Sequence, residues 1–245
     1  MADKTKRRRL RVANASGAPD DKAKYLQALL RTGEVTPEEV ALAAHLRHKS
    51  AALMVGQDTR DEVHIHHWAA GLARFGKRVM VQAGYALALK CLPLAQQNRY
   101  DWREPLQHLV DCAAAWLRNE DQAVNTAQAL AVSHQIEGDM AELTLLGLNS
   151  RAMQALTVVV NLGLLLNARE CDPMRSFTPL QLWNERPADP AWLCFVRMVW
   201  TTAWIADNSS RGLTTYVSTE PCRPATLHTI KFLRSRMLDQ KWKSL

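Results

Sequence analysis

The chain has 245 residues, 47% hydrophobic and 22% charged, a balance that allows a buried core and argues against wholesale disorder. Its formal net charge is +7, so acidic proteins, nucleic acid and anionic surfaces are the partners that its charge favours. The five cysteines are widely spaced and form no Cys-x-x-Cys pair, which argues against a secreted disulfide framework and predicts a cytoplasmic protein.

Ala and Leu dominate the apolar positions, and the β-branched residues are scattered instead of alternating along short runs. We therefore predict an all-α fold, an irregular multi-helix bundle with one main domain and a C-terminal helical extension. The apolar runs are well short of the roughly 20 residues that span a bilayer, so we expect no membrane association.

Residues 1–19 are predicted to form a disordered basic arm because they are cationic and carry little to bury. The main domain is expected over 20–170, with its first helix capped by Asp20 or Asp21. The segment from Thr36 to Glu39 combines an N-cap hydroxyl, a proline and a glutamate in the order of a capping box, which predicts a second helix. A short helix is expected around residues 50–54.

Residues 58–90 have helical periodicity but contain interior glycines, each of which costs about 1 kcal/mol relative to Ala in a helix. We expect either a break near Phe75-Gly76 or a close approach between helices at the glycines. Pro93 is expected to end this pattern. Asp101 and Glu104 then predict the start of another helix, and two long helices follow at about 122–147 and 150–169.

Four prolines fall within residues 171–190, which are predicted to be a linker that contains a short helix. Residues 191–245 are predicted to form a C-terminal helical region packed on the main domain. Its first helix carries Trp192, Phe195, Trp200 and Trp204, which are expected to be core residues. The last helix is expected at about 225–240.

One segment has the spacing of a metal site. Asp61, His64 and His67 would lie along one helical face, where three ligands could bind zinc or iron. A metal-dependent enzyme on this segment is one alternative, but an ordinary histidine cluster explains the same residues. The chain has no Gly-x-Ser-x-Gly elbow, Walker loop or dinucleotide-binding glycine pattern, so we predict neither catalysis nor a cofactor.

The positive charge is concentrated at the two ends of the chain, and the middle is close to balanced. Exposed cations at the ends would attract phosphates or an acidic protein with strong dependence on salt. The predicted contact residues are Lys6, Arg7, Arg8, Arg9, Arg11, Lys231, Arg234 and Arg236.

A family resemblance lies between about residues 75 and 166. An apolar helix ends in Cys91-Leu92-Pro93-Leu94, a polar break with Asn98 and Asp101 follows, and an Ala-rich helix then ends in Trp116-Leu117-Arg118. This order resembles the immunity proteins of bacterial polymorphic toxin systems. The resemblance implies a protein that binds and neutralises a cognate toxin, and it assigns no contact residues.

Two functions remain open at this point. The first is a non-enzymatic protein-binding module, an immunity protein if the resemblance holds, for which a basic chain would suit an acidic partner. The second is a nucleic-acid-associated helical protein that grips the phosphate backbone with its basic N-terminal arm and C-terminal helix.

Overall fold

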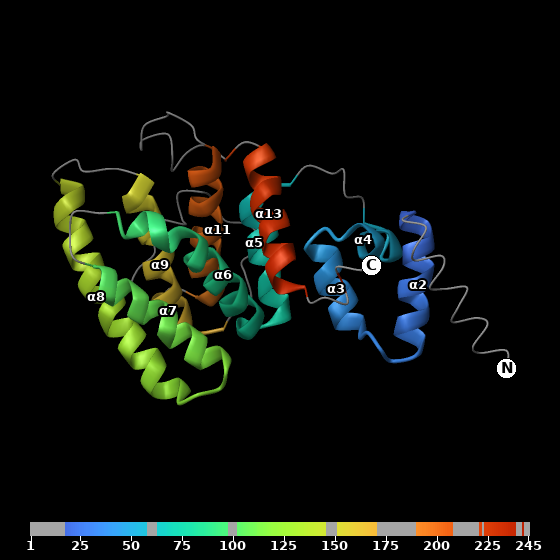
Figure 1. Cartoon of the computed structure of the whole chain (residues 1–245), viewed down its shortest axis with the longest axis horizontal. Coiled ribbons are helices and arrows are strands. Elements are labelled where there is room, and N and C mark those ends of the chain that lie inside the picture. The colour runs from blue at the N-terminus through green and yellow to red at the C-terminus, as the bar shows by residue number, and fades with distance from the viewer. Residues whose placement is uncertain are drawn as a thin grey trace. The chain divides into compact units, whose positions relative to one another are not determined.

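The computed structural model describes residues 18–57, 63–97, 102–145, 151–170, 190–207, 221, 223–238 and 242. Within these residues it has ten α-helices, one 3-10 helix and no strand, which confirms the predicted all-α, multi-helix fold (Figure 1). The chain divides into two compact units: unit 1 is Met1–Glu62 with Ile230–Leu245, and unit 2 is Val63–Thr229.

Unit 1 begins with three helices, α2 (Pro19–Arg31), α3 (Pro37–His45) and α4 (Lys49–Met54). The capping box of α3 is confirmed: the Glu39 N–H donates to Thr36 Oγ1 at 3.2 Å, and the Thr36 N–H donates to Glu39 Oε2 at 2.7 Å. The expected side-chain cap of α2 is wrong, because Ala18 occupies the N-cap position. Pro19 instead starts the helix with its fixed φ, which favours the first helical position.

The interior of unit 1 is completed by its C-terminal part. Leu26 and Leu46 are fully buried, and Trp242 is 4% exposed. The Trp242 ring meets the His48 ring edge-on, with 5.4 Å between centroids. Arg234 donates to the Arg47 carbonyl at 2.6 Å and so supports the turn between α3 and α4, where Arg47 has a φ of 59°.

Unit 2 contains the longer helices. They are, in chain order, α5 (Ile65–Ala70), the 3-10 helix η1 (Gly71–Phe75), α6 (Lys77–Ala95), α7 (Arg103–Leu117), α8 (Gln122–Leu145), α9 (Arg151–Asn167) and α11 (Ala191–Asp207). The helix α13 (Arg223–Met237) starts in unit 2 and ends in unit 1. Within the described part of the chain, no helix is both long enough and apolar enough to cross a bilayer.

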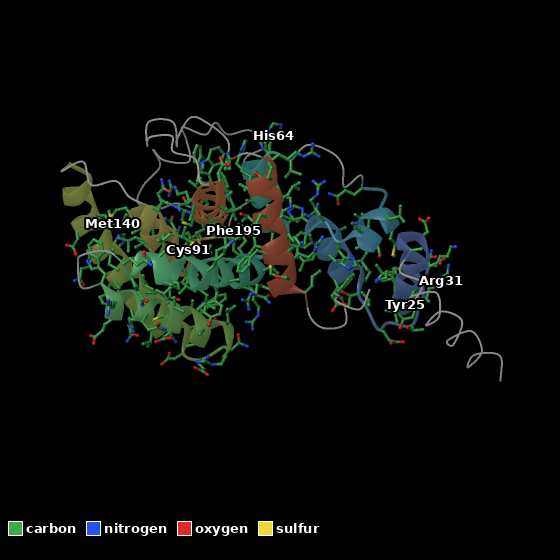
Figure 2. All side chains as sticks on the ribbon, turned by 45° about the horizontal axis from the view of Figure 1, so that its top comes forward. Tyr25, Arg31, His64, Cys91, Met140 and Phe195 are labelled. Atoms are coloured by element: carbon green, nitrogen blue, oxygen red, sulfur yellow. The ribbon has the colours of Figure 1, made fainter. Side chains whose placement is uncertain are left out.

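Helix α9 is the centre of unit 2, where it packs against α6, α7, α8 and α11 (Figure 1). Its sequence is apolar on nearly every side, as expected of a helix surrounded by others. Helix α11 also packs on α5 and α6. The aromatic residues of α11 are buried as predicted, and Phe195 lies among the interior side chains in Figure 2.

Two predicted features of residues 58–97 are confirmed and one is wrong. Gly76, with a φ of 86°, separates η1 from α6 as expected, because this backbone conformation favours glycine. A close approach also occurs at Gly84. The expectation that Pro93 ends the helix is wrong, since α6 continues to Ala95. Pro93 lacks the N–H that would pair with the carbonyl four residues earlier, that of Leu89, and Leu89 is 44% exposed.

Two glycines lie at close contacts between helices: Gly163 in α9 and Gly84 in α6. A Cβ placed on Gly163 would lie 2.1 Å from Ser133 Oγ and 2.8 Å from the Ala129 carbonyl oxygen of α8. A Cβ on Gly84 would meet only the ends of flexible side chains, Leu165 at 3.0 Å and Met198 at 3.2 Å. The α8–α9 contact is therefore close against backbone, whereas the contact of α6 with α9 and α11 has adaptable neighbours.

The boundaries of the two units differ from those of the predicted domains. Helices α2–α4 form a unit with the end of the chain, and α11 is grouped with α5–α9. Several predictions lie outside the described residues: the disorder of the N-terminal arm, the start of a helix at Asp101 and the linker over residues 171–189 with its short helix.

Candidate functional site

The candidate metal ligands named from the sequence can be placed only in part, because Asp61 lies outside the described residues. Nowhere in the described ranges do three or more His, Cys, Asp or Glu side chains gather as a metal site would require. His64 precedes α5 and lies at the surface in Figure 2, and the centroids of the His64 and His67 rings are 6.3 Å apart. His66 is buried against Trp200, with 5.6 Å between ring centroids, and belongs to the core.

The predicted cationic contact residues of α13 have different roles. Lys231 and Arg236 are exposed, and the Arg236 guanidinium lies 5.6 Å from the centre of the Phe232 ring. Arg234 is half-buried and donates to the Arg47 carbonyl, and burial lowers its pKa. The remaining predicted contacts, Lys6, Arg7, Arg8, Arg9 and Arg11, lie outside the described residues.

Two cations at the start of α6 support the ends of other helices. Lys77 Nζ donates to the carbonyls of Leu166 and Ala168 at 2.6 and 2.7 Å, at the C-terminus of α9. Arg78 donates to the Leu117 carbonyl and, at 2.7 Å, to Asn119 Oδ1, at the C-terminus of α7. Cations are favourable there because the last carbonyls of a helix are unpaired and carry partial negative charge. These two charges therefore serve the fold.

Helices α7 and α8, together with the turn that joins them, are acidic within a basic chain. Residues 103–145 contain seven carboxylates and two arginines, a net charge of −5, whereas the whole chain carries +7. One of these arginines, Arg118, pairs with Glu120 through two hydrogen bonds of 2.6 and 2.9 Å, which lower the pKa of that carboxyl. The carboxylates are Glu104, Asp111, Glu120, Asp121, Glu137, Asp139 and Glu142.

A groove of about 490 Å³ runs between the outer sides of α7 and α8. From α7 it is lined by Glu104, His108 and Asp111, all exposed, and from α8 by Val132 and Gln135. The buried sides of the two helices are apolar, because Leu106, Leu109 and Ile136 face the core. The groove thus offers hydrogen-bond acceptors and negative charge on a rigid helical pair.

A second hollow lies where four helices end. Its volume is about 580 Å³, and residues of all four helices line it. From the last turns of α6 and α11 come Lys90, Cys91, Leu94, Thr202, Ile205, Ala206 and Asp207, and from the first turns of α9 and α13 come Arg151, Pro224, Ala225 and His228. Arg151 donates to the Ile205 carbonyl at 2.7 Å, which fixes its guanidinium beside the hollow.

A buried cysteine, Cys91, forms part of the inner wall of this hollow. Cys91 is 3% exposed and lies inside unit 2 in Figure 2. Its Sγ is 3.8 Å from Thr202 Oγ1, and burial raises the pKa of the thiol to about 11. The inner wall is therefore uncharged at neutral pH, and the charges of the hollow come from Lys90, Arg151 and Asp207. Burial also lowers the pKa of Lys90.

Sequence reasoning missed both hollows, for different reasons. Lys90, Arg151, Asp207 and His228 are spread over more than a hundred residues of the chain and belong to no motif, so only the fold brings them together. The acidity of α7 and α8 did have a sequence signal. A local charge sum over residues 103–145 identifies it, whereas the average over the whole middle of the chain conceals it.

Comparison with known proteins assigns no function to either hollow. No protein-family model matches the chain, and neither the curated proteins nor the solved structures include a match.

Proposed function

We propose that this protein is a non-enzymatic protein-binding module of the cytoplasm, and that it neutralises a bacterial toxin by binding it. The single observation that carries the proposal is the charge of α7 and α8, which is opposite in sign to that of the chain as a whole. A concentrated patch of one sign steers a partner of the other sign into a defined orientation. The partner's contact surface is therefore basic.

The resemblance to immunity proteins supports the same region. The residues that carry it, about 75–166, fall on α6, α7, α8 and α9, which pack against one another in unit 2. The acidic groove lies on two of these four helices. The sequence alone suggests an acidic partner for a basic chain; the distribution of charge in the structure favours a basic partner at this face.

Coexpression with candidate toxins tests the proposal. The products of the genes that flank this one are expressed singly in a bacterial host, with and without this protein. We expect one product to arrest growth, coexpression to relieve the arrest, and the two proteins to bind when purified. The proposal is wrong if no flanking product is toxic and bound by this protein.

A double charge-reversal variant then tests whether the groove of α7 and α8 is the surface that binds the partner. Glu104→Lys with Asp111→Lys should weaken binding roughly tenfold or more, because both side chains are exposed in the groove. The matched control, Asp20→Lys with Glu38→Lys, makes the same change of net charge on unit 1 and should leave affinity within about twofold. Equal losses in both pairs would show that net charge, and not this face, governs binding.

Nucleic-acid association is the second candidate, favoured by the exposed Lys231 and Arg236 on α13. It predicts retention on duplex DNA that falls steeply with salt, because released counterions drive such binding. Lys231→Gln with Arg236→Gln, or deletion of residues 1–12, should reduce the retention. A protein that passes through DNA and heparin columns at low salt would exclude this candidate.

A further inference from the structure

We draw no further inference here: the strongest candidate, the side-chain cluster of His108, Cys112 and Gln128 between α7 and α8, in which the cysteine Sγ lies 3.5 Å from the histidine Nε2 and 4.0 Å from the glutamine Oε1, is explained by hydrogen bonds within the helical pair and adjoins the groove already described, so it points to no ligand of its own.

Discussion

In unit 1, short helices of 13, 9 and 6 residues share their interior with Trp242 from the end of the chain, and a histidine lies at the contact. In unit 2, four helices pack against α9, and its Gly163 lies so close to α8 that a Cβ would be 2.8 Å from the Ala129 carbonyl oxygen. Unit 1 therefore depends on one large side chain from a distant part of the sequence. Unit 2 depends on many contacts between helices and on Gly163, which has no side chain.

The largest expected effect concerns unit 1. Trp242→Ala should lower its stability by about 3–5 kcal/mol, because a buried aromatic side chain is lost and leaves a cavity. Hydrogen exchange measured by mass spectrometry should become faster throughout α2, α3 and α4. The amides of α9 and α11 should keep their protection from exchange. An equal loss of protection in both units would show that unit 1 does not depend on Trp242 more than unit 2 does.

In unit 2, the addition of a single methyl group should be enough to lower stability. Gly163→Ala should reduce the free energy of unfolding by about 2 kcal/mol, because overpacking against Ser133 and the Ala129 carbonyl outweighs the gain in helix propensity. Urea denaturation followed by circular dichroism measures this loss.

Gly84→Ala is the control for that variant. The added methyl group meets only flexible side-chain ends, and the gain in helix propensity offsets the contact, so stability should stay within about 1 kcal/mol. If Gly84→Ala costs as much as Gly163→Ala, the nature of the neighbouring atoms does not decide the cost.

The smallest effect is a dependence on pH in unit 1. Burial lowers the pKa of His48, with Arg234 and Lys22 acting in the same direction and a hydrogen bond to the Trp242 backbone opposing them. The unfolded state, with a histidine pKa near 6.5, then binds the proton more readily than the folded state. The stability that His48 contributes is present above about pH 6.5 and is lost as the pH falls below that value.

Fluorine NMR of 5-fluorotryptophan-labelled protein can follow this effect, since Trp242 is the one tryptophan in the sequence of unit 1. Its resonance should broaden or shift between pH 7 and pH 5 while those of Trp200 and Trp204 remain constant. His48→Phe keeps an aromatic ring beside Trp242 but cannot titrate, and it should flatten the response. A response unchanged in His48→Phe would assign the pH dependence to another group.

In both units the sequence predicts local features but not the contacts between distant parts of the chain. The capping box at Thr36 and Glu39, the break at Gly76 and the burial of the α11 aromatics all follow from local patterns, and the structure confirms them. The contact between Trp242 and His48 joins residues nearly two hundred positions apart, and no local pattern signals it. The hollow beside Lys90 and Arg151 is hidden for the same reason, since it exists only once four helix ends meet.

Lys77 and Arg78 add a consequence for the order of folding. Their acceptors lie 89 and 91 residues away for Lys77, and 39 residues away on Leu117 for Arg78. Closing such distant contacts is slow relative to forming a single helix. During synthesis, a chain shorter than about 170 residues lacks the two carbonyls that accept from Lys77, although α6 can already form. The start of α6 is thus completed late, when α9 arrives, and the same step brings Gly163 against α8.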